Sequence, residues 1–172
     1  MTSGPATGLR PVVVPVPRPD VLGSLFVVLG GVMGLLQLAL SWTYVVAGVG
    51  LPGSATAPNG WGIYITMRAG STVSASWAIG GYAVIGVGIA GAALVLLGLA
   101  MLAPLDHRPF GLAGLVLSLA AMGAAGWWLA RSAQLMGQNL SALFANAGPG
   151  WYLFLIGGAI ALVGSVKALA SG

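Results

Sequence analysis

The chain of 172 residues contains no cysteine, one histidine and few charged side chains. Without a thiol it has no disulfide, no cysteine nucleophile, no cysteine-ligated zinc and no iron–sulfur cluster. A single histidine also excludes haem ligation by two histidines of this chain. The two acidic residues, Asp20 and Asp106, and six basic residues leave a net charge of +4. That charge is too thinly spread to indicate nucleic-acid binding.

Charged residues make up 5% of the sequence and hydrophobic residues 58%, against about 25% and about 45–50% in soluble domains. So few charges cannot cover a water-exposed surface. The apolar residues form four blocks, at about 21–47, 78–103, 109–130 and 150–169. About 20 such residues cross a hydrocarbon core of about 30 Å. We therefore expect an all-α integral membrane protein with a four-helix bundle over 21–172, preceded by a proline-rich leader at 1–20.

The basic residues indicate the orientation of the bundle. Arg10, Arg18, Arg108 and Lys167 fall on one side of the expected membrane, and Arg68 and Arg131 fall on the other. Basic residues favour the cytoplasmic side. The Trp and Tyr residues lie near the opposite ends of the blocks. Both termini are therefore expected in the cytoplasm, and the protein is expected to be a multi-pass protein of the inner (plasma) membrane.

The stretch "PLDHRP" at 104–109 joins the second and third blocks. Proline is favoured in the first turn of a helix, and aspartate caps the free N–H groups there. We expect Asp106 to act as this cap and His107 to lie in water. A cluster of Asp20, Asp106 and His107 at the same membrane surface is the alternative, and it is the basis for a less favoured enzyme hypothesis. We expect no catalytic residue, no metal site and no cofactor.

Small residues recur along the expected helices at the four-residue spacing that allows close helix packing. The glycines selected by this spacing are Gly30, Gly34, Gly86, Gly88 and Gly157. They hold the bundle together, or one stripe of them contacts a partner. Gln37 and Ser41 form a polar pair one turn apart in the first block. Hydrogen bonding within the bundle is the favoured interpretation of that pair, and lining of a ligand cavity is the alternative.

The two longer links are expected on the outer face. Residues 61–77 alternate between apolar and polar, which predicts a β-hairpin. The outer hairpin surface is expected to include Trp61, Ile63, Tyr64, Ile65 and Trp77. Its apolar face is expected to be covered by the second outer segment or by another subunit. Residues 132–146 carry apolar residues at helical spacing. This pattern predicts a short amphipathic helix on the membrane or a continuation of the third span.

Two resemblances follow from these features. Four spans, a large first outer loop and the "GWGIY" stretch at 60–64 resemble the claudin and tetraspan architecture, although that family's loop cysteines are missing here. Abundant Ala, Gly, Val and Leu, five Arg to one Lys, and the proline-rich leader resemble small four-helix membrane proteins of actinobacteria. Some of those are accessory subunits of Mce-type lipid importers or of the respiratory supercomplex.

The resemblance implies a non-catalytic accessory or stabilising subunit of a larger membrane complex, such as a lipid transporter. Its partners would be other integral membrane subunits and the lipid bilayer, with no nucleic acid. The competing hypothesis is a separate protein that binds or transports an apolar small molecule or lipid. The leader at 1–20 is either a solvated tail or a strap along a cytoplasmic partner.

Overall fold

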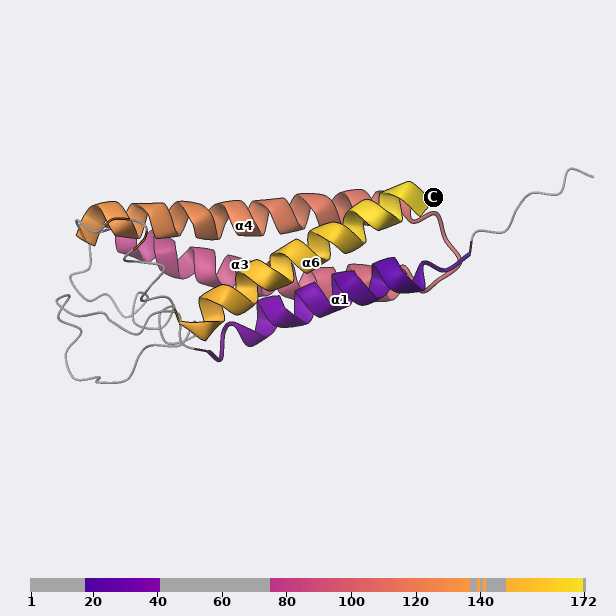
Figure 1. Ribbon diagram of the computed structural model, residues 1–172, viewed down its shortest axis with the longest axis horizontal. Helices are drawn as coiled ribbons and strands as arrows, with labels where there is room; N and C mark the ends of the chain where they lie inside the picture. Colours follow the sequence, from indigo (N-terminus) through magenta and orange to yellow (C-terminus); the bar gives the residue numbers. More distant parts are fainter. Residues whose placement is uncertain (1–17, 41–74, 137–138, 140, 142–147, 172) are drawn as a thin grey trace, which may run out of the picture.

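The computed structural model describes residues 18–40, 75–136, 139, 141 and 148–171, and all regular structure within these ranges is helical. The four helices are α1 (Val21–Leu36), α3 (Ala75–Ala100), α4 (Arg108–Met136) and α6 (Pro149–Ser171). Each runs opposite to the one before it along the chain (Figure 1). The expected all-α bundle of four helices is confirmed for these residues.

The helices begin at residues suited to helix starts. The carboxylate of Asp20 accepts a hydrogen bond of 3.0 Å from the backbone N–H of Gly23 in the first turn of α1. Asp106 accepts one of 3.1 Å from the N–H of Arg108, which confirms the predicted cap of α4. α6 begins with Pro149, whose missing N–H has no partner to lose in a first turn.

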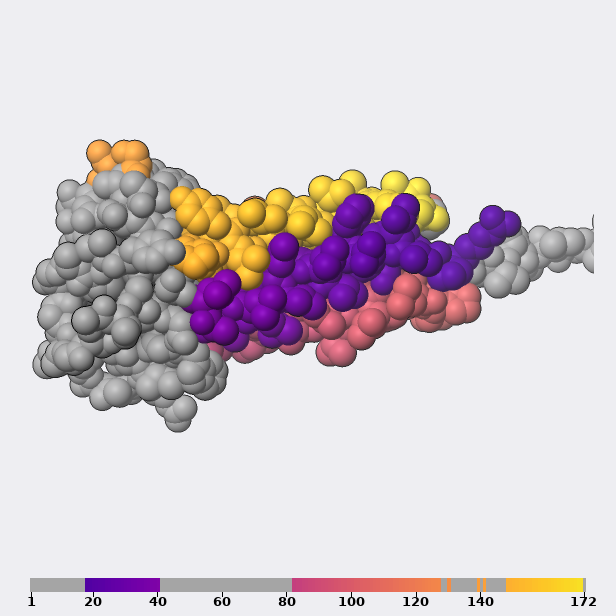
Figure 2. Space-filling model, turned by 60° about the horizontal axis from the view of Figure 1, so that its bottom comes forward, coloured from indigo at the N-terminus to yellow at the C-terminus, as the bar shows by residue number. Residues whose placement is uncertain are grey.

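The helices pack as a ring in which α1 and α4 do not share a major interface. α1 packs against α3 and α6, and α4 packs against the same two helices from the other side. Figure 2 shows α1 lying between α6 and α3 on one face of the bundle. Every helix therefore has two helical neighbours and one face directed outwards.

Many large aliphatic side chains point outwards, and the interior combines small residues with larger side chains such as Leu94, Met101, Trp151 and Phe154. Exposed residues on the four helices include Leu29, Ile89, Leu96, Val116, Ile156 and Val163. This distribution suits a bundle surrounded by lipid, where close packing of small residues holds helices together. Three segments are long and apolar enough to cross a membrane: Tyr82–Ala100, Arg108–Trp127 and Pro149–Ser171.

α1 has 16 residues and is shorter than these segments, yet it lies alongside almost all of the apolar length of α3. At one end the N–H of Asp20 donates to the carbonyl of Met101 over 3.3 Å. At the other end the amide of Gln37 donates to the carbonyl of Val84 over 3.3 Å. The two hydrogen bonds are 17 residues apart on either side of the contact, from Asp20 to Gln37 and from Val84 to Met101. At 1.5 Å per residue this corresponds to about 26 Å.

The predicted outer hairpin is not supported. The described residues contain no strand, and Ala75 to Trp77, which were expected in its second strand, form the first turn of α3. Residues 61–74 lie outside the described part of the chain. The prediction is wrong at 75–77 because an alternation over only three residues, Ala75, Ser76 and Trp77, can arise by chance. A helix extending from the apolar span satisfies its backbone groups within one segment.

The ends of α1 and α4 differ from those expected. α4 continues without a break to Met136. Residues 132–136 are therefore a continuation of the third span, which was one of the two alternatives predicted for residues 132–146. α1 ends at Leu36, well before the expected 47, in a turn closed by N–H groups of residues 38 and 39 bonding to the carbonyls three residues back. Residues 41–47 and 142–146 lie outside the described ranges.

Candidate functional site

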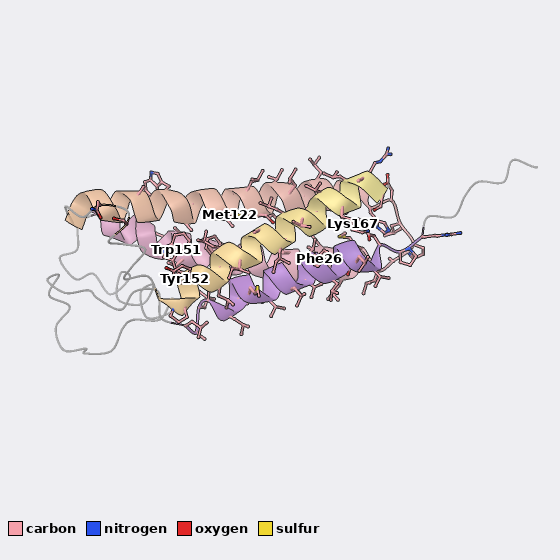
Figure 3. The ribbon with its side chains drawn as sticks, viewed as in Figure 1. Phe26, Met122, Trp151, Tyr152 and Lys167 are labelled. Atoms are coloured by element: carbon pink, nitrogen blue, oxygen red, sulfur yellow. The ribbon has the colours of Figure 1, made fainter. Side chains whose placement is uncertain are left out.

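A polar cluster at one end of the bundle is centred on Asp20, whose residue is 7% exposed. One carboxylate oxygen, Oδ1, accepts from Gly23 N and forms an ion pair with Nζ of Lys167 in α6. The other oxygen, Oδ2, accepts a hydrogen bond of 3.0 Å from the hydroxyl of Ser171. Figure 3 shows Lys167 beside the start of α1, with Trp151 and Tyr152 at the opposite end of α6. The carboxylate therefore fastens the start of α1 to the end of α6.

Opposing effects act on the ionisation of Asp20, which precedes the apolar part of α1. Burial alone would raise the pKa of this carboxyl. Hydrogen bonds from Lys167, Gly23 and Ser171, together with the positive charge of Lys167, outweigh burial and lower the pKa below its ordinary value of 3.8. Asp20 is therefore ionised at neutral pH.

His107 lies in this cluster and is 3% exposed. Its Nε2 atom is 2.8 Å from the carbonyl oxygen of Arg18 and 3.1 Å from the backbone nitrogen of Asp20. The prediction that His107 lies in water is wrong. The link between α3 and α4 folds under the start of α1, and the imidazole contacts backbone groups that precede the first helical turn and have no partner within it.

Asp106 lies outside the cluster, because it is exposed and caps α4. The structure thus brings together two of the three residues considered from the sequence, Asp20 and His107. It adds Lys167 and Ser171, which the sequence analysis did not combine with them. Lys167 and Ser171 are four residues apart and therefore lie on one face of a helix. This spacing was the sequence feature that could have indicated that they act together. Among the described residues, no three His, Cys, Asp or Glu residues are grouped to hold a metal ion.

Glycines on α1 and α6 occupy close helix contacts. A Cβ atom added to Gly30 would lie 2.4 Å from the carbonyl oxygen of Gly157, and one added to Gly157 would lie 2.6 Å from the Cβ of Met33. A Cβ on Gly34 would lie 3.2 Å from the Cα of Gly91 in α3. These positions hold α1 close to α6 and α3.

The two glycines selected on α3 have different surroundings. A Cβ on Gly88 would contact the side chain of Leu38 at 2.8 Å, whereas one on Gly86 would have no described atom within 4 Å. Gly91 and Gly98 make the close contacts of α3 with α1. A Cβ added to Gly91 would lie 2.7 Å from the carbonyl oxygen of Gly31, and one added to Gly98 would lie 3.0 Å from the backbone nitrogen of Val28. The sequence spacing had not selected Gly91 and Gly98, and it had selected Gly86, which faces away from α1.

Gln37 is completely buried, and its side-chain amide donates to the carbonyl of Val84. A cavity between all four helices has room for about one water molecule. It is lined by Gly30, Gly34, Val87, Ala90, Gly91, Leu94, Ser118, Ala121, Phe154 and Gly158. Gln37 is not among its lining residues. Ser41, Trp61, Ile63, Tyr64 and Ile65 lie outside the described residues, and Trp77 is described only as part of the α3 backbone.

The outer face of α4 carries small residues that the bundle does not use. Cβ atoms added to Gly123 and Gly126 would have no described atom within 4 Å. Ala120 and Ala124 are exposed next to them, and Trp127 is 50% exposed. The sequence analysis did not select these glycines.

Comparison of the chain with protein-family models, curated proteins and solved structures gave no match.

Proposed function

We propose that this protein is a non-catalytic accessory subunit that stabilises a larger membrane complex, with the outer face of α4 as its contact surface. The observation that carries the proposal is the outward position of Gly123 and Gly126. Glycine destabilises a helix interior by about 1 kcal/mol relative to alanine. In lipid its compensating advantage is close approach of another helix, which these two positions do not receive within the described bundle.

The neighbouring residues suit a helix partner. Ala120 and Ala124 are small and exposed on the same side of α4, and Trp127 supplies a large exposed side chain there. We call residues 120, 123, 124, 126 and 127 the α4 small-residue face. Its partner would be another integral membrane subunit, and a lipid transporter is the kind of complex that the sequence resemblance favours. The remaining outward faces would contact lipid.

The proposed membrane orientation places the Asp20 cluster on the cytoplasmic side of the inner (plasma) membrane. Arg18, Arg108 and Lys167 lie at this end of the bundle and favour that side. The cavity between the described helices holds about one water molecule, which is less space than a stand-alone binder of an apolar molecule would need there. For this reason the accessory role is preferred.

Co-purification from the native host in a mild detergent tests the proposal. Gly123→Leu and Gly126→Leu should each reduce the yield of co-purifying membrane subunits at least fivefold, because a leucine would hold a partner helix away. The matched control is Gly86→Leu on α3, which also faces open space and should leave that yield unchanged. Thermal unfolding of each isolated variant is monitored by tryptophan fluorescence. A melting temperature equal to that of the wild type establishes that the bundle is intact.

Retention of the same partners at normal yield by both α4 variants would refute the contact surface. Isolation of the wild-type protein with lipid but no stoichiometric protein would refute the accessory role and favour a lipid binder. Loss of partners in Gly86→Leu alone would place the contact on α3.

A further inference from the structure

The imidazole of His107 is held by one nitrogen only. Nε2 lies 2.8 Å from the carbonyl oxygen of Arg18, while Nδ1 is buried and has no hydrogen-bond partner among the described residues. A carbonyl accepts only from a donor, so the Arg18 contact requires the proton on Nε2. The N–H of Asp20 then bonds to the carbonyl of Met101. The geometry therefore fits the neutral ring with its proton on Nε2.

A second proton would have to enter at Nδ1, where the described residues offer no acceptor. A buried donor without a partner is destabilising, and more so when it carries charge. In an opened or unfolded chain the same N–H would bond to water. Proton uptake by His107 therefore favours a state in which the ring has left its site.

The surrounding charges do not offset this effect. The segment before α1 supplies Arg18 and Asp20, the link of His107 supplies Asp106 and Arg108, and α6 supplies Lys167. The titratable side chain described on α3, Tyr82, belongs to the opposite end of the bundle. The carboxylate of Asp20 already binds Lys167, Ser171 and Gly23 N, and Asp106 is exposed and caps α4. An imidazolium would thus add positive charge beside a carboxylate that is already paired.

We propose that His107 forms a proton-sensitive hydrogen-bonded contact between the segment entering α1 and the α3–α4 link. In its neutral form its Nε2–H donates to the carbonyl of Arg18 and so holds the segment before α1 against the link. On mild acidification it releases this carbonyl, so that the segment entering α1 separates from the link. The ion pair of Asp20 with Lys167 is independent of this step and continues to join α1 to α6.

His107 is the one histidine of the chain, so its ring signals in a nitrogen-15 NMR spectrum need no separate assignment. In the wild-type protein in detergent we expect the neutral ring with its proton on Nε2 at pH 7.5. Between pH 7.5 and 5.5, protection of the Asp20 amide, which bonds to the carbonyl of Met101 at the end of α3, should fall at least tenfold in hydrogen exchange corrected for intrinsic rates. The fall should follow the protonation of the ring. The amide of Ala161, in the middle of α6, should keep its protection within threefold.

The matched variant is His107→Gln, whose side-chain N–H₂ can donate to the Arg18 carbonyl but does not take up a proton in this range. The protection of its Asp20 amide should change by less than threefold between the two pH values. An equal fall in the variant would overturn the proposal. Protonation of the wild-type ring without loss of amide protection, or a neutral ring with its proton on Nδ1, would overturn it even if the variant failed to fold.

Discussion

Asp20 and Lys167 form an ion pair between residues that are 147 positions apart in the sequence. The pair joins the start of α1 to the last turns of α6, and its two partners differ in exposure. The side chain of Asp20 is 5% exposed, and that of Lys167 is 37% exposed. Because the acid is the buried partner, removal of its charge should destabilise the bundle more than removal of a charge from an exposed ion pair usually does.

Asp20→Asn should lower the free energy of unfolding by about 1–2 kcal/mol at pH 7. Asparagine is also a good helix cap, so this variant chiefly removes the charge-assisted bonds to Lys167 and Ser171. Asp20→Ala should cost about 1 kcal/mol more, because it removes the cap as well. Denaturation of the isolated protein in detergent measures both differences. Equal stability of the wild type and Asp20→Asn would show that the ion pair contributes nothing.

The same pair predicts a loss of stability in strong acid. The pKa of Asp20 is lower in the folded protein than its ordinary value of 3.8, so the unfolded chain binds the proton more tightly. The stabilisation is therefore complete well above pH 4 and is lost as the pH falls through the folded-state pKa. Melting temperatures measured from pH 5 to pH 2 should fall more steeply in the wild type than in Asp20→Asn. Parallel curves would contradict the assignment.

The contrast between Gly30 and Gly126 gives a prediction about packing. Alanine at Gly30 places its Cβ 2.4 Å from the Gly157 carbonyl oxygen, so the helices must separate, at a cost of about 1–3 kcal/mol. Alanine at Gly126 meets no described atom and gains up to about 1 kcal/mol of helix propensity. Thermal unfolding of the two isolated variants compares the same substitution in opposite environments. A loss of stability at both positions would show that the outer face of α4 is packed in the isolated protein.

The proposed orientation can be tested by cysteine labelling, because the natural chain contains no cysteine. Leu105 in the α3–α4 link and Asn139 beyond α4 are both exposed. Asn139→Cys should react with a membrane-impermeant maleimide added to intact cells. Leu105→Cys should react only after the membrane is permeabilised. The reverse pattern would place the Asp20 cluster on the outer side.

Local features of the sequence were sufficient to predict much of the fold. Four long apolar blocks predicted four helices, and the "PLDHRP" link predicted the cap by Asp106, because both depend on residues adjacent in the chain. The hairpin prediction failed at 75–77 for a related reason. Alternation over a few residues is weak evidence for a strand when a strongly apolar helical span follows immediately.

The inward faces of the helices, and the residues that meet at their ends, were decided by the tertiary structure. In a soluble helix the polar stripe marks the outer face, but lipid and protein interior are both apolar, so the sequence of α3 does not show why Gly91 faces α1 while Gly86 faces outwards. The burial of His107 and its meeting with Asp20 likewise depend on how the α3–α4 link folds against α1. The chain itself determines where helices form and which of their residues are small enough for close contact. The rotation of each helix about its axis determines which of those contacts are made, and it depends on packing against all its neighbours at once.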